Sequence, residues 1–423
     1  MVRSAERGIR TWLARALELP RNVWQAILGM WKDQAATFGE QETFSAIRID
    51  RRELQRIERL LQAGLPADGM GQHPEDGASA DDEAIVRRIE ERTRRANRNN
   101  VTRTAAYWSV YRGFPELHWA LLAHLVSRNG GWNMTDLQGE LLPRLLTRAT
   151  RERLFAMLED ANAFIFGDAY PQLLLYEASV RGARPLFHLL SRFHVSAFMR
   201  PFWERFWETR EPAMLTMALI VNEQHYIESR IVRDPDVQSH VLNTVPFQAQ
   251  SALQLNQVVL PYGERNDAGR RRLAGLVLEN FGNLNERIEV GKKLYAMLFG
   301  IPAVANGAQA FASAVPHTGS RADMWPELFT PVRESFASAA YTERLDGECL
   351  KPGAERFYSP RLAEAWKDVP LREPERYDWL RGAERACKYI ADVRPPFPFD
   401  MSAEYCYGLN KVELAVLAKA ALL

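Results

Sequence analysis

Helical punctuation is the feature of this sequence that most narrows the possible folds. Apolar residues recur at spacings of three and four, and prolines and glycines fall where helices are expected to start and end. Pro115 precedes three leucines spaced by four, and the pair Gly130-Gly131 closes the predicted helix. Strand patterns, in which β-branched residues alternate with polar ones between turns, are almost absent. The sequence therefore predicts an all-α fold with a bundle-like body of many helices.

Two further helices of this body have distinct sequence signals. After Gly167, Asp168 is expected to cap a new helix that carries Pro171 in its first turn. The segment from Arg270 to Phe299 has apolar side chains at spacings of three and four over its whole length. It predicts a long helix that packs along a partner helix.

The clearest interruption of the helical pattern is the stretch GLPADGMGQHPEDGASADDE, which is rich in Gly, Pro, Ala and acidic residues. It predicts a flexible linker over residues 63–83. The linker divides an amphipathic helical arm, residues 1–62, from a helical core domain, residues 84–300, and a C-terminal region, residues 301–423.

The C-terminal region has a looser pattern, with a stretch of small residues and several prolines. Helices are expected over residues 375–393 and 411–423. Asn410 and Glu413 have the spacing of a capping box, which places the start of the last helix at Lys411. We expect this helical region to pack on the core domain.

Overall composition excludes several classes of protein. The 54 Lys and Arg residues balance 53 Asp and Glu, so the net charge of +1 creates no general attraction to nucleic acid or to an anionic membrane. The 3 cysteines are widely spaced, which indicates neither a disulfide framework nor a zinc site. No secretory signal or apolar segment of membrane-spanning length is visible. We expect a cytoplasmic protein with no transmembrane segment, no metal and no cofactor.

One local charge pattern nevertheless raises the possibility of nucleic-acid binding. The run RRIEERTRRANRNNVTRTAAYWSVYRG, with its aromatic residues, mixes guanidinium groups and rings as single-strand binding grooves do. The candidate contacts within residues 87–112 are Arg94, Arg95, Arg98 and Arg103. Glutamates lie in the same run, so a solvated helix face with internal ion pairs is the favoured interpretation.

The string HWALLAHLVSRNGGWNMTDL contains the first candidate site. His124 and Arg128 are four apart and extend the apolar row of the helix that Pro115 starts. The functional hypothesis makes His124 an acid or base, Arg128 an oxyanion or phosphate clamp, and Asp136 the group that orients the histidine. Asn129 and Asn133 are candidate ligand-binding residues. The favoured alternative is a buried hydrogen-bond network that ties the helix end to its loop.

A second polar cluster, NEQHYIESR, follows an apolar run. Glu223 is the candidate catalytic carboxylate, and Asn222 and Tyr226 are candidate ligand-binding residues, because these side chains occupy more than one helix face. The Glu-x-x-His spacing of a di-iron protein is absent. Phosphate-binding loops, dinucleotide fingerprints, nucleophile elbows and zinc-protease motifs are also absent from the sequence.

Tryptophans of the N-terminal arm suggest a possible docking surface. Trp12, Trp24 and Trp31 lie among arginines, as in helices that rest on a membrane surface. The arm also carries glutamates and has only a modest apolar face. Docking of the arm on the body or on a protein partner is therefore the favoured prediction, and peripheral membrane contact is the alternative.

Several strings resemble the bacterial YppC-like family, a family of unknown function. They include RNNVTRTAAYW, GDAYPQLLLYEAS, LFHLLSRFHVSAFMRPFWE, ALIVNEQHYIE and NERIEVGKKLYAMLFG. The resemblance covers roughly residues 91–300. It implies a bacterial protein and supplies no catalytic residues.

Two main hypotheses about function follow from these patterns. The first is an interaction or scaffold protein, with an unknown protein partner and buried polar networks. The alternative is a hydrolase or transferase that acts on a phosphorylated or carboxylated substrate. The two differ in whether the polar strings around His124 and Glu223 border an open cleft or are sealed in the core.

Overall fold

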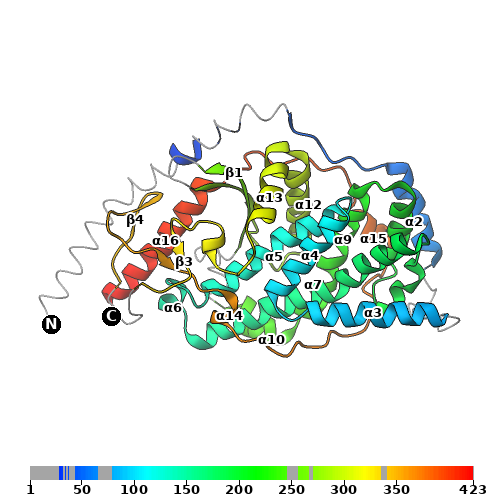
Figure 1. Cartoon of the computed structure of the whole chain (residues 1–423), viewed down its shortest axis with the longest axis horizontal. Helices are drawn as coiled ribbons and strands as arrows, with labels where there is room; N and C mark the ends of the chain where they lie inside the picture. Colours follow the sequence, from blue (N-terminus) through cyan, green and yellow to red (C-terminus); the bar gives the residue numbers. More distant parts are fainter. Residues whose placement is uncertain are drawn as a thin grey trace, which may run out of the picture.

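A computed structural model describes residues 28–31, 34, 37, 43–64, 79–244, 256–265, 270–334 and 341–422. These residues form a mostly helical fold, which confirms the predicted class (Figure 1). The longer helices are α2 (Arg51–Gly64), α3 (Ala80–Ala96), α4 (Asn100–Gly113), α5 (His118–Asp136), α7 (Arg148–Gly182), α8 (Met199–Thr209), α9 (Pro212–Ile227), α12 (Leu284–Gly300), α13 (Pro302–Ala314) and α16 (Ser402–Leu422).

Short elements connect these helices. The short helical segments are α6 (Leu142–Leu145), η2 (Phe187–Phe193), η3 (Glu228–Val232), α10 (Pro235–Val237), η4 (Gln238–Leu242), η5 (Arg321–Asp323), α14 (Leu362–Ala365) and α15 (Ala383–Cys387). The strands are β1 (Gln257–Arg265), β2 (Arg271–Val277), β3 (Phe329–Thr330), β4 (Leu345–Asp346), β5 (Cys349–Leu350) and β6 (Phe357–Tyr358).

Helix α5 occupies the centre of the core. It contacts α4, α7, α9, α12 and β1, and in Figure 1 it lies among these elements. Most of its side chains are buried, including Trp119 and Trp132. A helix that is buried on every side must also bury its polar residues, and those residues need partners inside the protein.

The predicted end of α5 at Gly130-Gly131 is wrong, because the helix continues to Asp136. These glycines allow close packing instead of ending the helix. A Cβ atom on Gly131 would lie 2.4 Å from Oδ1 of Asn100 and 2.5 Å from Nε2 of His317. No larger residue fits there without displacing both side chains.

The predicted helix start at Asp168 is also wrong. Helix α7 runs unbroken from Arg148 to Gly182, and it contains Gly167, Asp168 and Pro171 in its interior. Both Asp168 and Pro171 are buried there. Packing of this long helix against α3, α4, α5 and α9 outweighs the local preference of glycine and proline for helix ends.

The predicted helix from Arg270 to Phe299 is wrong in its first half. Residues Arg271–Val277 form strand β2, which pairs antiparallel with β1, and α12 begins at Leu284 after the capping residue Asn283. Leu273, Ala274 and Gly275 are consecutive and all buried, so the strand has no alternating pattern. Together with α12, its apolar residues gave the spacings of three and four that are typical of a helix.

Both edges of this hairpin are covered. On the β1 side, the Asn129 side chain of α5 donates to the Val259 carbonyl at 2.8 Å and accepts from the Val259 amide at 2.9 Å. On the β2 side, the Gly275 amide donates to the Phe399 carbonyl at 2.9 Å, and the Met401 amide donates to the Leu273 carbonyl at 2.8 Å. These bonds satisfy the groups that an isolated two-stranded sheet would expose.

Part of the N-terminal arm packs on the body. Ile57 and Leu61 of α2 are buried in contact with α8 and α15, and Ile47 pairs with Val393 through backbone hydrogen bonds. Trp12 and Trp24 lie outside the described residues, whereas the Trp31 side chain is 69% exposed. Residues 65–78 of the predicted linker also lie outside the described residues. Helix α3 begins at Ala80 with a capping box, so the last residues assigned to the linker are helical.

The C-terminal region contributes to both apolar clusters of the core. It contains less helix than predicted between residues 375 and 393, where only Ala383–Cys387 is helical. The predicted cap at Asn410 is wrong, because α16 begins at Ser402 and contains both Asn410 and Glu413. Glu413 instead accepts hydrogen bonds from the Arg344 amide at 2.7 Å and the Leu345 amide at 3.1 Å.

No single helix among the described residues is both long enough and apolar enough to cross a membrane. Helices α12 and α13, which meet at a bend of 92°, satisfy these conditions together by length and composition only.

Candidate functional site

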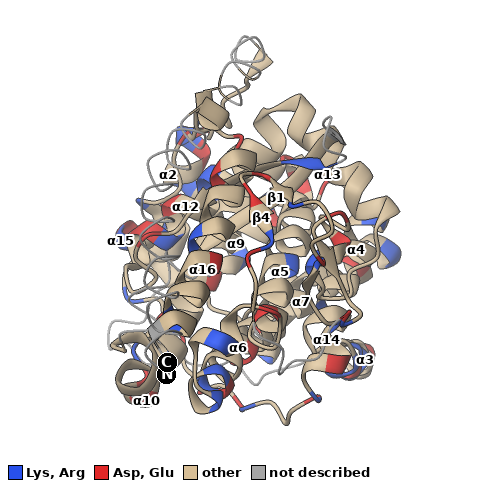
Figure 2. Cartoon of the chain, turned by 90° about the vertical axis from the view of Figure 1, so that its left-hand side faces the viewer, with Lys and Arg blue, Asp and Glu red and all other residues tan. Residues whose placement is uncertain are grey.

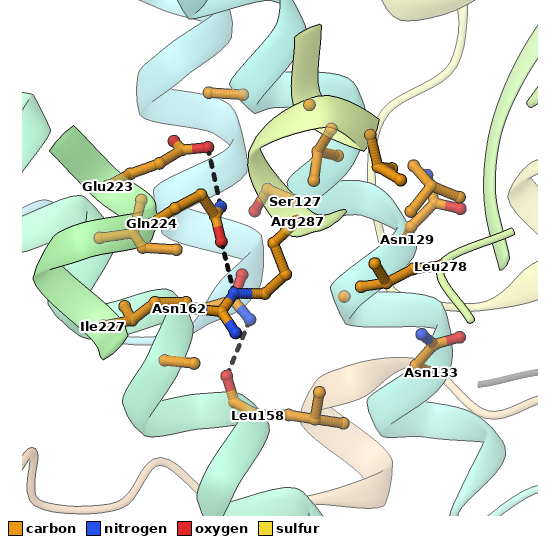
Figure 3. A pocket seen from close by; sticks show the side chains of 18 of the residues that line it. Ser127, Asn129, Asn133, Leu158, Asn162, Glu223, Gln224, Ile227, Leu278 and Arg287 are labelled. Atoms are coloured by element: carbon orange, nitrogen blue, oxygen red, sulfur yellow. Dashed lines mark hydrogen bonds between the residues drawn. The ribbon is translucent and has the colours of Figure 1, made fainter. Parts of the chain in front are cut away.

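The candidate site is a cavity of about 260 Å³ between α5, α7, α9, α12 and the hairpin (Figure 3). Apolar side chains from these elements form most of its wall. The polar lining residues are Arg103, Ser127, Asn129, Asn133, Asn162, Glu223, Gln224, Asn256, Gln257 and Arg287. An apolar cavity with a few polar groups is the usual form of a small-molecule site.

Glu223 is the carboxylate of this cavity. It lies in the last turns of α9, where its half-buried side chain borders the cavity (Figure 3). Burial raises the pKa of Glu223 to about 8, although hydrogen bonds from the Gln224 and Trp119 side chains oppose the shift. The Gln224 amide donates to Oε1 at 3.2 Å. The carboxyl group is therefore mostly protonated at neutral pH, and it can donate a hydrogen bond or a proton.

A chain of polar contacts leads from Glu223 to Arg287 of α12. Nε of Arg287 donates to Oε1 of Gln224 at 2.9 Å, as the dashed lines of Figure 3 show. The same guanidinium forms a buried ion pair with Glu228 and donates to the Phe281 carbonyl at 2.5 Å. Its charge is thus paired outside the cavity with Glu228, which the exposed Arg233 also contacts at 2.8 Å, and its side chain has a fixed orientation.

Arg103 of α4 is the second cation in the wall. Its guanidinium is 2.5 Å from the Glu159 carboxylate of α7, and both side chains are almost completely buried. It also donates to Oδ1 of Asn97 at 3.1 Å. The sequence indicated Arg103 as a nucleic-acid contact, but the structure encloses it in an ion pair, so that prediction is wrong for this residue.

The other predicted nucleic-acid contacts lie on exposed surface. Arg95 pairs with Glu91 on the same helix, and Arg98 pairs with Asp368 at 3.0 Å. Arg94 is exposed on α3. Figure 2 shows basic and acidic residues interspersed along the visible helices. The arrangement agrees with a solvated helix face, and nucleic-acid binding stays a prediction.

His124 and Arg128 belong to a packed network. Nδ1 of His124 donates to the Thr104 carbonyl at 2.8 Å, and burial lowers the pKa of this histidine to about 3. Arg128 donates to the Val315 carbonyl, and its guanidinium lies 4.5 Å from the centre of the Phe311 ring. A histidine that is neutral at physiological pH and 3% exposed is poorly placed to act as an acid.

Asp136 does not orient His124, so the predicted pairing is wrong. The Asp136 carboxylate binds the Arg321 guanidinium through Nε at 2.9 Å and Nη2 at 2.7 Å. Arg321 also donates to Oδ1 of Asn133 at 3.0 Å. The end of α5 is thereby tied to η5, as in the structural interpretation of this string.

Of the four candidate ligand-binding residues, three asparagines and one tyrosine, only Asn129 and Asn133 line the cavity. Asn222 faces another buried network, in which it donates to Asp168 at 2.5 Å and accepts from the Trp379 indole at 2.8 Å. Tyr226 lies with its ring centre 3.9 Å from the Arg230 guanidinium. The cavity thus brings Glu223, Asn129 and Asn133 together with Arg103, and the other candidates do not line it.

Comparison with known proteins identifies the relatives of this fold. Residues 95–402 match the family described as "Protein of unknown function (DUF2515)". The chain belongs to this family. The "Uncharacterized protein YppC" of Bacillus subtilis (strain 168) is 42% identical over 240 residues, which are 57% of this chain and 73% of YppC. No solved structure matches the chain. The match confirms the resemblance and extends the DUF2515 region far beyond residue 300.

Several cavity residues of this DUF2515 chain were not predicted as functional. Asn162 was visible as a polar residue within an apolar stripe of α7. Gln224 was visible beside Glu223 in NEQHYIESR. Arg287 and Asn256 gave no signal, because one lay in a predicted helix seam and the other precedes a strand that was not predicted. Among the described residues, no group of three or more His, Cys, Asp and Glu side chains is arranged to hold a metal ion.

Proposed function

We propose that this chain binds a small, neutral, largely apolar molecule in the cavity beside Glu223. The observation that carries the proposal is the pairing of charge in the cavity wall. Arg103 is paired with Glu159, and Arg287 is paired with Glu228. Burial raises the pKa of Glu223 to about 8, so its carboxyl group is mostly neutral at pH 7. A neutral ligand enters such a site without leaving an unpaired charge.

The size of the cavity sets the size of the ligand. An empty apolar cavity of about 150 Å³ binds benzene in another protein. The cavity of about 260 Å³ has room for a bicyclic molecule of roughly ten heavy atoms. The protonated Glu223 carboxyl would then meet a hydroxyl, carbonyl or ring nitrogen of that molecule.

The hydrolase or transferase hypothesis has less support. A phosphorylated or carboxylated substrate would meet guanidinium groups that are already paired, and His124, Arg128 and Asp136 do not line the cavity. Glu223 would be the group that transfers a proton in any such reaction. The interaction or scaffold role stays a prediction, and the presence of the cavity does not bear on it.

Titration calorimetry with 1-naphthol and 1-naphthoate tests the proposal. The wild-type chain is expected to bind the neutral 1-naphthol at least tenfold more tightly than the anion. Ala161, which lines the cavity on α7, is replaced by Phe to fill the space. Ala161→Phe is expected to weaken 1-naphthol binding at least tenfold. Ala178→Phe, on the same helix but outside the cavity lining, is the matched control and is expected to bind normally.

Three results would count against this function. They are no binding of 1-naphthol to the wild-type chain, equal binding to the Ala161→Phe variant, and stronger binding of 1-naphthoate. Hydrolysis of 1-naphthyl phosphate by the wild-type chain would favour the hydrolase hypothesis instead, and the fluorescence of released 1-naphthol would report it.

A further inference from the structure

Asn256 is a buried amide in the cavity wall that lacks a partner. It is 6% exposed and lines the cavity at the start of the hairpin. Neither its Oδ1 nor its Nδ2 forms a hydrogen bond within the described part of the chain. Oε1 of the neighbouring Gln257, which also lines the cavity, is buried and unpartnered as well. Buried side-chain amides are almost always bonded, so this pair of residues calls for an explanation.

The backbone of Asn256 is hydrogen-bonded at the open end of the hairpin. The Asn256 carbonyl accepts a hydrogen bond from the Leu278 amide at 2.8 Å, which closes the open end of the hairpin. The next residues pair in register, Gln257 with Val277 and Val258 with Leu276. A polar group held on a regular element keeps a fixed direction, as ligand-binding groups do.

The chemistry of an asparagine side chain defines its complement. The group presents one acceptor oxygen and one donor nitrogen side by side. A ligand that offers an adjacent donor and acceptor in one plane satisfies both atoms at once, as adenine does when asparagine reads it in DNA. Lactams, primary amides and nucleobase edges share this pattern.

We infer that the ligand of the cavity carries a neutral, planar donor and acceptor pair of the lactam type, which is bound by the Asn256 side chain. The inference rests on the proposed function and specifies its ligand class. A lactam is neutral, in keeping with the paired charges of the wall, and its rings would fill the apolar part of the cavity. The unpartnered Gln257 oxygen supplies a further acceptor beside the same strand.

Matched bicyclic probes test this assignment by titration calorimetry. Isoquinolin-1(2H)-one carries the lactam pair, its N-methyl derivative lacks the donor, and naphthalene lacks both groups. The wild-type chain is expected to bind the lactam at least tenfold more tightly than either of the other two. In Asn256→Leu, that preference is expected to disappear while naphthalene binds as before. Asn256→Asp keeps the shape but removes the donor, and it is expected to lose the preference too.

The variants also separate this inference from the proposed function. The assignment is overturned if wild-type protein binds all three probes equally, because solvent then satisfies the amide as well as the lactam does. It is also overturned if Asn256→Leu keeps the preference. In both cases the cavity would still bind apolar molecules. Absence of binding by every probe would overturn the proposed function together with the inference.

Discussion

Two polar regions share the central helices of this fold and differ in what their side chains face. Around His124 and Arg128, donors meet backbone carbonyls and aromatic rings of packed neighbours. Around Glu223, polar groups border a cavity of about 260 Å³. Both regions interrupt apolar stripes in the same way in the sequence. The difference indicates that a polar residue within an apolar stripe is simply a buried residue. A binding site requires, in addition, a cavity next to that residue.

The largest expected effect on stability is at the Arg321–Asp136 ion pair, which belongs to the packed network at the end of α5. Arg321→Met leaves the Asp136 carboxylate without its cation, so unfolding should require about 3–5 kcal/mol less free energy. Urea denaturation measures the change. Arg361→Met, on an exposed surface pair, serves as the control and should stay within about 0.5 kcal/mol. A loss below about 1 kcal/mol for Arg321→Met would show that this network is not closed.

The second expected effect is a pH dependence of the unfolding free energy that comes from Glu223 in the cavity wall. The pKa of Glu223 is raised from 4.5 to about 8 in the folded state, so the folded protein holds this proton more tightly than the unfolded chain does. The resulting stability is complete below pH 4.5 and is lost as the pH rises through about 8. The difference between 4.5 and about 8 corresponds to about 5 kcal/mol, and because the side chain is only partly buried the loss should be on the order of 2–4 kcal/mol.

Denaturation curves at a series of pH values measure this loss in wild type and in Glu223→Gln. The variant should lose about half of the decline. The other half should persist from Asp168, whose pKa burial raises from 3.8 to about 7. Glu208→Gln, on an exposed side chain, should follow the wild-type curve. Identical curves for wild type and Glu223→Gln would mean that Glu223 is ionised and solvated.

His124→Leu should have an intermediate effect on stability and none on binding. The variant loses the hydrogen bond to the Thr104 carbonyl and leaves that carbonyl buried, at a cost of about 1–2 kcal/mol. Affinity for 1-naphthol should stay within about twofold of wild type. A tenfold loss of affinity in a folded variant would join the two regions into one site and remove the contrast between them.

The smallest effect is expected on the exposed arginine face. Arg95→Gln removes a surface pair with Glu91 and should change the unfolding free energy by less than about 0.5 kcal/mol. Fluorescence anisotropy with a single-stranded oligonucleotide should give equal, weak binding for variant and wild type. Binding that weakens steeply with salt, and weakens further in the variant, would support nucleic-acid recognition.

The sequence allowed the helical class to be predicted, and it singled out Glu223, which lines the cavity, because both signals depend on local spacing. It did not allow the hairpin to be predicted. Residues 273–275 are buried together, so β2 lacks the alternation that distinguishes a strand from a helix. Asn256 was missed for the same reason. The helix end at Gly131 and the helix start at Asp168 were misplaced because tertiary contacts, which spacing does not encode, decide them.

The paired hydrogen bonds between Asn129 and Val259 have a consequence for kinetics. They join the hairpin wall of the cavity to the central helix α5, and both must break before that wall can swing outward. The rate at which the Val259 amide hydrogen exchanges with solvent therefore reports how often the hairpin wall of the cavity opens. A ligand that leaves much faster than this hydrogen exchanges must escape by another route, past α9 and α12.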